Sequence, residues 1–314
     1  MNEIVFGLLF IFAAIGLSIL ILLSIRLLIS IAPHFFPEQN LSQKYGHSAV
    51  VIGGTDGMGL LIVKKLISQN ISVFCVGFQT ENLTQEDLPE GSTLINGSIS
   101  DSSIMDAVLN HIKVNKPSLL FNCAALCIPQ RFIQTDNPKK YVETYIGTLT
   151  QLTQAFLINA INDHQGKNNK YGIVFFSSQV YMFSSPFASL YSSTKAFTNQ
   201  FARSLSAEYP QVDFLVLNPG AVNETSFFKY FPNFWYFKIL SFLGEKKSSV
   251  VSLIFRSIGR IHVIDTGIYT YLTRIIVSLF DDNIIDFCAS RMSSSVFDQI
   301  EKEKKYLNAP KIYN

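Results

Sequence analysis

The feature that most constrains this chain of 314 residues is its apolar N-terminus. Residues 4–25, IVFGLLFIFAAIGLSILILLSI, carry no charge, and LLISIA continues the apolar run after Arg26. Roughly 20 consecutive apolar residues span the hydrocarbon core of a bilayer. A cleaved signal peptide normally has a shorter apolar region that follows basic residues, whereas Glu3 is the only charged residue before this run. The sequence therefore predicts a retained membrane anchor over residues 1–33.

The charges that follow the anchor predict which side of the membrane holds the rest of the chain. Arg26, Lys44 and Lys64 come after the apolar run, and basic residues are enriched on the cytosolic side of membrane helices. We therefore expect the remainder to face the cytosol. The formal net charge of +2 gives no reason to expect a nucleic-acid partner.

The cysteines do not indicate disulfides or a metal site. A chain of this length with four cysteines does not need disulfides to stabilise a small core. Cys123 and Cys127 are four residues apart, but no second pair and no cluster of histidines completes a metal-ligand pattern. The sequence predicts no metal.

Short apolar segments alternate with amphipathic segments after residue 46. The expected strands cover 47–52, 71–76, 93–95, 118–122, 172–177 and 212–218. The expected helices cover 59–69, 101–113, 137–162 and 189–209. Such alternation is typical of an α/β, doubly wound parallel sheet of the Rossmann type. We expect this domain over residues 34–260, followed by an apolar segment and charged tail over 261–314.

A glycine-rich stretch, IGGTDGMG at residues 52–59, lies between the first expected strand and the first expected helix. Gly53, Gly57 and Gly59 would let the backbone turn tightly and approach a pyrophosphate, with the helix N-terminus directed at the anion. A plain turn also explains an isolated glycine pattern, but the position between strand and helix favours dinucleotide binding. The second strand ends in Val76-Gly77-Phe78-Gln79, without an acidic residue for ribose hydroxyls or an arginine for a 2′-phosphate. This favours NADPH and leaves NADH open.

Tyr191 and Lys195 are four residues apart within SLYSSTK. On a helix this spacing puts both side chains on one face, one turn apart. An inert pair on a surface helix is the simpler interpretation of the spacing alone. The surrounding motifs decide between the two interpretations.

Together, these stretches resemble the short-chain dehydrogenase/reductase family over roughly residues 47–225. The glycine motif appears at residues 52–59, and the family's Asn-Asn-Ala-Gly is similar to Asn122-Cys123-Ala124-Ala125. The family's Tyr-x-x-x-Lys is Tyr191 to Lys195, with Ser178 thirteen residues before the tyrosine, and its Pro-Gly is Pro219-Gly220.

The resemblance implies a hydride-transfer enzyme with four catalytic positions. Tyr191 would protonate a ketone oxygen, Lys195 would lower the tyrosine pKa and hold the nicotinamide ribose, and Ser178 would bind the carbonyl. Thr144 stands where the family has a helix asparagine that completes a proton relay. The cofactor-binding positions that the resemblance implies are Gly53, Thr55, Asp56, Gly57, Met58, Gly59, Ser98, Asn122, Ala124, Tyr191, Lys195, Pro219, Gly220 and Val222.

Several positions depart from the family pattern. Ala125 replaces the last glycine after the fourth strand, and Ser98 replaces an aspartate common after the third. Glu224 precedes Thr225, which is displaced from the threonine expected shortly after Pro-Gly. With Thr144, these departures keep open a non-catalytic, membrane-tethered nucleotide-binding or interaction protein.

Two membrane-anchored subgroups look closest and suggest a lipid substrate. One is the very-long-chain 3-oxoacyl-CoA reductase and 17β-hydroxysteroid dehydrogenase group, and the other is the 3-ketodihydrosphingosine reductase group. Their likeness implies a ketone on a long-chain lipid, acyl-CoA or steroid, at the cytosolic face of the endoplasmic reticulum membrane. A homodimer or a complex with fatty-acid elongation partners is also open. The aromatic stretch 227–243 is a candidate cover for an acyl chain, although core packing explains it equally well, and membrane contact is open for 227–243 and 268–280.

Overall fold

The computed structural model describes residues 2–78, 83–163, 170–225, 229–233 and 235–303, and the chain divides into two compact units at residue 37. The first unit consists of helix α1 (Asn2–Phe35) and the two residues that follow it. Among the described residues, α1 is the one helix long and apolar enough to cross a membrane, and the apolar window within it is 0% buried. The expected apolar N-terminal helix is present.

The second unit is built around a parallel sheet. Its strand order is β3-β2-β1-β4-β5-β6-β9, and every pairing is parallel. These strands are β1 (Ser48–Ile52), β2 (Ser72–Gly77), β3 (Thr93–Asn96), β4 (Leu119–Asn122), β5 (Tyr171–Phe176), β6 (Val212–Pro219) and β9 (Val263–Thr266). A small second sheet pairs β7 (Val222–Asn223) with β8 (Glu245–Lys246). The α/β fold of the Rossmann type is confirmed.

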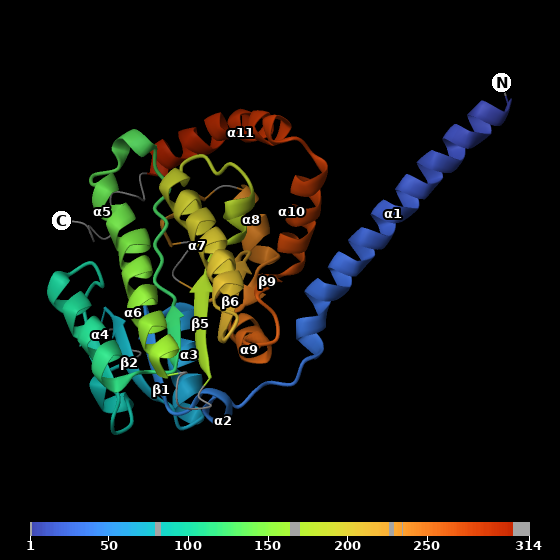
Figure 1. Cartoon of the computed structure of the whole chain (residues 1–314). Coiled ribbons are helices and arrows are strands. Elements are labelled where there is room, and N and C mark those ends of the chain that lie inside the picture. Colours follow the sequence, from blue (N-terminus) through green and yellow to red (C-terminus); the bar gives the residue numbers. More distant parts are fainter. Residues whose placement is uncertain (1, 79–82, 164–169, 226–228, 234, 304–314) are drawn as a thin grey trace. The chain divides into compact units, whose positions relative to one another are not determined.

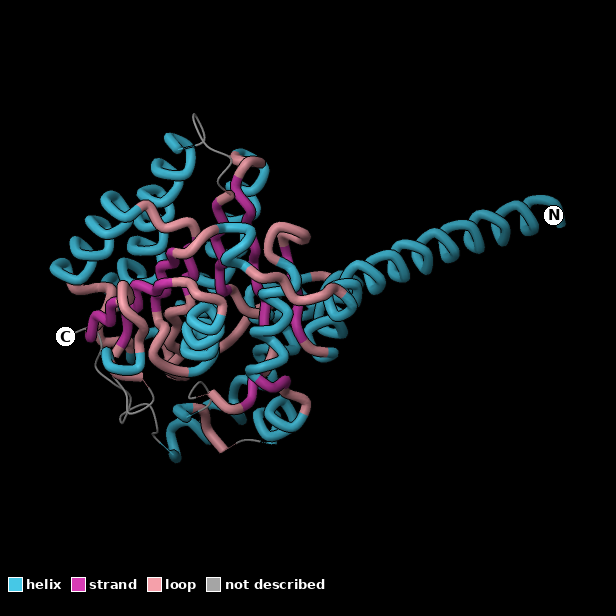
Figure 2. The backbone as a smooth tube through the Cα atoms, turned by 90° about the horizontal axis from the view of Figure 1, so that it is seen from below, coloured by secondary structure: helices cyan, strands magenta, loops and turns pink. Residues whose placement is uncertain are grey.

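Helices cover both faces of the main sheet (Figure 1). Figure 2, which views the backbone from below, has helices on either side of the strands. The helices of this unit are α2 (Leu41–Tyr45), α3 (Gly57–Ser68), α4 (Ser102–Asn115), α5 (Pro138–Val142), α6 (Thr148–Asp163), α7 (Ser189–Glu208), α8 (Trp235–Phe242), α9 (Lys247–Ser257), α10 (Ile268–Leu279) and α11 (Asp282–Glu303).

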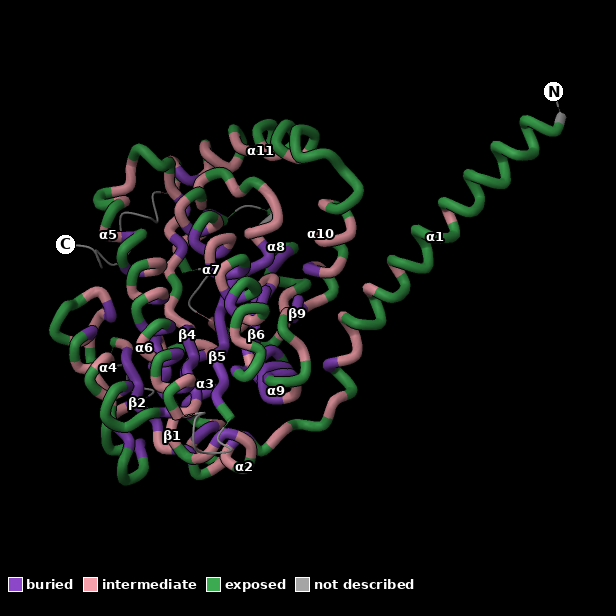
Figure 3. The backbone as a smooth tube through the Cα atoms, viewed as in Figure 1, coloured by how far each residue is buried: buried purple, intermediate pink, exposed green. Residues whose placement is uncertain are grey.

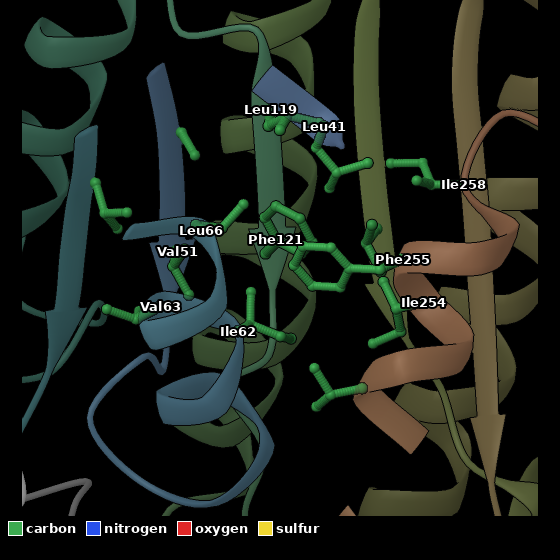
Figure 4. Packing of buried hydrophobic residues seen from close by; sticks show 14 of the residues in the cluster. Leu41, Val51, Ile62, Val63, Leu66, Leu119, Phe121, Ile254, Phe255 and Ile258 are labelled. Atoms are coloured by element: carbon green, nitrogen blue, oxygen red, sulfur yellow. The ribbon is translucent and has the colours of Figure 1, made fainter. Parts of the chain in front are cut away.

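Alternation along the strands divides the core into two clusters. Successive residues of a strand point to opposite faces, so Val51 packs in one cluster and Val50 in the other. The first cluster includes α3 and α9, and Figure 4 shows Phe121 of β4 among their side chains, including Ile62 and Phe255. The second cluster joins the opposite face to α4, α6 and α7. Strands buried on both faces explain the continuous purple of β4 and β5 in Figure 3.

The structure differs from the sequence expectation at two elements. Strand β9 adds a seventh strand, beyond the six expected and beyond the domain boundary drawn at residue 260. Its sequence, VIDT, is short and half polar, so it has no clear strand pattern. The helix expected over 137–162 is divided by a π-helical segment, Glu143–Gly147, between α5 and α6. Single π turns within helices often occur at functional sites.

Candidate active site

A cleft of about 450 Å³ lies at the carboxyl ends of the strands. The order of the sheet reverses between β1 and β4, and ligands of such folds bind at this reversal. All the site residues predicted from the sequence line the cleft, with the exception of Asn122. These lining residues are Gly53, Thr55, Asp56, Gly57, Met58, Gly59, Ser98, Ala124, Thr144, Ser178, Tyr191, Lys195, Pro219, Gly220 and Val222.

Asn122 lies behind the cleft rather than on its wall. Its side chain is 9% exposed and borders an adjacent cavity of about 10 Å³. Thr144 and Lys195 border both this cavity and the cleft. Asn122 is therefore placed beside two predicted catalytic residues.

The glycine-rich loop forms a tight cradle at the start of α3. Gly53 has φ +77°, and a Cβ atom there would lie 2.8 Å from the backbone of Ala124. A Cβ atom on Gly59 would lie 2.0 Å from the carbonyl oxygen of Gly53. Neither position accommodates a side chain, so the backbone itself forms the wall. Asp56 caps α3, and its carboxylate accepts a hydrogen bond from the Gly57 N–H at 2.7 Å.

This cradle fits the pyrophosphate of a dinucleotide. The first N–H groups of a helix have no partner within the helix, and the helix dipole favours an anion there. Gly77 and Phe78, at the end of β2, line the cleft on the side where an adenosine would lie. Gln79, which the sequence analysis used to infer the cofactor, lies outside the described residues.

Helix α7 turns one face toward the sheet and the cleft. Its buried positions include Tyr191, Thr194, Lys195, Thr198 and Asn199, which follow the helical repeat. The predicted pair thus lies on the buried face and not on a surface helix. Tyr191 is 8% exposed and Lys195 is 6% exposed.

Ser178, Tyr191 and Lys195 meet in one place. A hydrogen bond joins the hydroxyls of Ser178 and Tyr191, and the Lys195 ammonium lies 5.4 Å from the centre of the Tyr191 ring. The Lys195 Nζ donates to the carbonyl oxygen of Phe176 at 2.7 Å. The Ser177 hydroxyl donates to the carbonyl oxygen of Lys195 at 2.8 Å and ties α7 to the end of β5.

Burial determines the protonation of this group. Burial raises the pKa of the Tyr191 phenol, the nearby Cys127 raises it further, and the hydrogen bond from Ser178 lowers it. The sequence analysis expected Lys195, together with the positive nicotinamide of the oxidised cofactor, to lower this pKa, and that effect stays a prediction. Burial also lowers the pKa of Lys195 to about 8, while Cys123 and Cys127 act in the opposite direction.

Thr144 lies in the π-helical segment, where it is 4% exposed. Its hydroxyl donates to the carbonyl oxygen of Lys140 at 2.8 Å, so it is bonded back to its own helix. Thr148 in turn donates to the carbonyl oxygen of Thr144. Thr144 is thus at the expected place, with its hydroxyl and carbonyl both engaged within the helix.

The cleft contains residues to which the sequence analysis gave no role. Thr225 lies close to the cradle, because its methyl carbon would be 3.8 Å from a Cβ on Gly57. Its hydroxyl donates to the carbonyl oxygen of Val222 at 3.0 Å. The sequence signal that could have identified Thr225 was the displaced threonine after Pro-Gly. Glu224 has a left-handed backbone conformation, with φ +61°, and this turn directs the chain back toward the cradle. Tyr145, Phe176, Lys229, Tyr230 and the thiol-bearing Cys127 also line the cleft, without a motif that identifies them.

Comparison with known proteins begins with a family model. The model of the short chain dehydrogenase family matches residues 47–233, which is well over half of the chain. The matched region contains the glycine-rich loop, Ser178, Tyr191 and Lys195.

Curated relatives are similar over part of their length. A short chain dehydrogenase from Pseudocercospora fijiensis is 27% identical over 205 residues, which cover 60% of this chain and 64% of the relative. The very-long-chain 3-oxoacyl-CoA reductase of Macaca fascicularis is 26% identical over 184 residues, covering 55% and 57%. The 17-beta-hydroxysteroid dehydrogenase type 3 of Homo sapiens is 27% identical over 203 residues, covering 59% and 62%. The chain thus spans less than two thirds of the length of these relatives.

Solved structures share the fold. A 7beta-hydroxysteroid dehydrogenase superimposes with a TM-score of 0.69 at 17% identity, covering 80% of this chain and 100% of that one. A serine dehydrogenase complexed with NADP+ gives a TM-score of 0.59 at 18% identity, covering 71% and 95%. The fold, the site and the family match lead to one conclusion: the chain belongs to the short chain dehydrogenase family.

Proposed function

We propose that this protein is a membrane-anchored oxidoreductase that reduces a ketone on a long-chain lipid, with NADPH as the hydride donor. The observation that carries the proposal is the meeting of Ser178, Tyr191 and Lys195 in a cleft that also contains the glycine cradle. A phenol and a hydroxyl in hydrogen-bond contact give a ketone oxygen two donors at one point. A nicotinamide cofactor bound in the cleft supplies the hydride.

Each residue then has a definite task. The carbonyl carbon gains the hydride, and its oxygen takes the proton of the Tyr191 phenol. Ser178 donates a hydrogen bond to the same oxygen and holds the carbonyl in place. Lys195 carries a positive charge below pH 8 and stabilises the phenolate that the proton transfer leaves. A proton from solvent restores the phenol after each turnover.

The relatives and the N-terminal helix support a lipid substrate. The names of two relatives refer to very-long-chain 3-oxoacyl-CoA and to a 17-beta-hydroxysteroid. Such molecules partition into membranes, and an enzyme tethered by α1 would meet them there. We place the protein in the endoplasmic reticulum membrane with its reductase unit in the cytosol, alone, as a homodimer or with fatty-acid elongation partners.

Apolar surface outside the cleft agrees with this setting. Ile268, Leu272 and Ile276 follow one another at single-turn intervals along α10, and all three are exposed. In segment 227–243, which we propose as the cover of the acyl chain, Trp235 is exposed and residues 227, 228 and 234 lie outside the described part. The exposed apolar side chains of α10 would then add membrane-facing surface to the reductase.

The reaction can be tested with the full chain in lipid nanodiscs. NADPH oxidation is followed with a very-long-chain 3-oxoacyl-CoA, 3-ketodihydrosphingosine and a 17-ketosteroid, and the products are identified by mass spectrometry. We expect the 3-oxoacyl-CoA or the steroid to be reduced, and faster with NADPH than with NADH. Reduction of 3-ketodihydrosphingosine alone would assign the protein to the other lipid pathway.

A second candidate is a non-catalytic nucleotide-binding protein. The observation that favours it is Thr144, whose hydroxyl is bonded within its own helix where the family has an asparagine. Cofactor binding without reduction of any ketone in the nanodisc assay would support this alternative. Reduction of a ketone would exclude it.

A further inference from the structure

Helix α10 is bonded to the turn that follows Ser178. The Thr270 hydroxyl donates to Gln179 Oε1 at 3.0 Å, and the Arg274 Nη2 donates to the Tyr181 hydroxyl at 2.8 Å. Gln179 and Tyr181 belong to the short helical turn Gln179–Met182, for which Ser178 is the N-cap. Thr270 is 0% exposed and Gln179 is 5% exposed, so the bond between them is shielded from water, whereas Tyr181 and Arg274 are half-buried.

The same arginine is bonded to the end of the sheet. Arg274 forms a two-pronged ion pair with Asp265, in β9. Asp265 Oδ1 also accepts a hydrogen bond from Asn218 Nδ2 at 3.0 Å, and Asn218 Oδ1 accepts from Asn199 Nδ2 at 2.8 Å. We call these four residues, together with Tyr181, the polar network.

The polar network joins the two elements that carry the proposed catalytic groups. Asn199 lies on α7 one turn after Lys195 and two turns after Tyr191, on the same buried face. At its other end, Tyr181 belongs to the turn that begins at Ser178. Among the residues described as lining the cleft, none belongs to the polar network. We therefore look for an effect of these residues on the position of the catalytic groups.

We propose that Arg274 is a positioning residue that fixes the turn beginning at Ser178 relative to the helix that carries Tyr191. This inference rests on the proposed reduction. A guanidinium suits this task because its planar fork binds Asp265 with two bonds and leaves a further N–H directed at Tyr181. A displacement of about 1 Å in a reacting group can reduce a rate about 100-fold. Asp265 and Arg274 lie beyond the region that the family model matches.

A purely structural role of Arg274 has to be distinguished from the positioning role. A buried ion pair often contributes little net stability, whereas removal of one partner leaves an uncompensated charge that destabilises the fold. Loss of Arg274 would therefore lower the melting temperature in either case. A variant that leaves the ion pair intact separates the two roles.

Tyr181→Phe is that variant. It removes only the hydroxyl that accepts from Arg274, and the pair between Arg274 and Asp265 remains. The matched control is Tyr209→Phe, which removes a tyrosine hydroxyl bonded to Glu208 at the far end of α7. Both are prepared as the full chain in nanodiscs, with Arg274→Met and Arg274→Lys alongside.

The kinetic test compares the effect of each variant on kcat with its effect on the cofactor Kd. We expect kcat of Tyr181→Phe to fall about tenfold and that of Arg274→Met about 100-fold. The cofactor Kd should change less than twofold in Tyr181→Phe, and the control should match the wild type in both. Arg274→Lys should recover only part of the kcat lost in Arg274→Met, because an ammonium does not reproduce the fork. A lower melting temperature with unchanged kcat in the Arg274 variants would overturn the proposal.

A second readout does not depend on turnover. Amide hydrogen exchange of residues 178–182 is measured by mass spectrometry on the cofactor-free chain, and we expect it to be faster in Tyr181→Phe than in Tyr209→Phe. Equal exchange in the two variants would overturn the proposal. If the wild type reduces no ketone, the proposed function fails, and the exchange rates alone decide whether the polar network holds the turn.

Discussion

Lys195 is the residue whose charge most directly affects the cleft. Its ammonium is buried, donates to the Phe176 carbonyl and lies against the Tyr191 ring. Burial disfavours the charged form of a lysine, so a buried ammonium loses its proton more readily than one in water. The structure thus places a titration close to neutral pH at the centre of the proposed active site.

This titration predicts how cofactor binding depends on pH. Burial lowers the pKa of Lys195 to about 8, and an anionic cofactor favours the protonated lysine. Affinity should therefore be constant below pH 7 and weaken as pH rises through 8, by up to about tenfold per pH unit. Calorimetric titration with NADPH from pH 6 to pH 9.5 measures the effect. In Lys195→Met the affinity should be weaker and should lose this dependence on pH; an unchanged dependence would assign the titration to another group.

A substitution at Gly59 tests whether the glycine cradle binds the cofactor. A Cβ atom there would lie 2.0 Å from the Gly53 carbonyl oxygen, so Gly59→Ala must displace the loop. Gly147→Ala is the matched control, because its Cβ would have no neighbour closer than 4.0 Å. We expect Gly59→Ala to weaken NADPH binding at least about tenfold, a loss of about 1.4 kcal/mol. Fluorescence titration measures the Kd for NADPH. Equal Kd values for the two variants would contradict the proposal that the cradle binds the cofactor.

At the scale of elements, the sequence predicted the strands and helices that have a regular apolar pattern of their own. Strands β1, β2, β5 and β6 each contain a run of apolar residues, and α7 has a clear buried face. Both kinds of element and the Tyr191–Lys195 pair could therefore be located in advance. Strand β9 could not, since VIDT depends on pairing with β6 and on a hydrogen bond from Asn218, both distant in sequence. The sequence of the π-helical segment, ETYIG, has no pattern that distinguishes it from an ordinary helix. The polar network was missed for the same reason as β9.

Helix α9 supplies a test of this packing. Phe255 is 0% exposed and lies in the core cluster between α9 and the sheet. Phe255→Ala should lower the free energy of unfolding by about 3–5 kcal/mol through the cavity that it leaves. The exposed Leu279 of α10 is the control, for which Leu279→Ala should change it by less than about 0.5 kcal/mol. Thermal unfolding of the full chain in detergent should show a shift of about 10 °C for Phe255→Ala alone; similar shifts for both would be inconsistent with this core.

At the scale of the whole molecule, we propose that α1 anchors the enzyme in a membrane. An apolar helix is followed by five residues, 36–40, before α2 of the reductase unit begins. The proposed cytosolic orientation follows from the basic residues after the anchor.

Glycosylation reports this orientation. The chain has five Asn-x-Ser/Thr sequences after the anchor, at Asn40, Asn70, Asn82, Asn96 and Asn223. A cytosolic reductase unit never meets the glycosylation machinery, so we expect none of them to carry a glycan in cells. Endoglycosidase treatment should leave the electrophoretic mobility unchanged. An N-terminal extension that carries an added Asn-x-Thr sequence is the positive control, which should be glycosylated if the N-terminus is lumenal. A mobility shift of the native chain after this treatment would show that the reductase unit is lumenal and would contradict the proposed orientation.

The most direct test of the central claim is the rate of ketone reduction by Tyr191→Phe beside the wild type. The variant keeps the ring that packs in the cleft and removes the proton that the mechanism delivers. With a very-long-chain 3-oxoacyl-CoA and NADPH, the account predicts that kcat falls about 10²–10⁴-fold while NADPH affinity changes less than about threefold. A variant that reduces the ketone at the wild-type rate would contradict it.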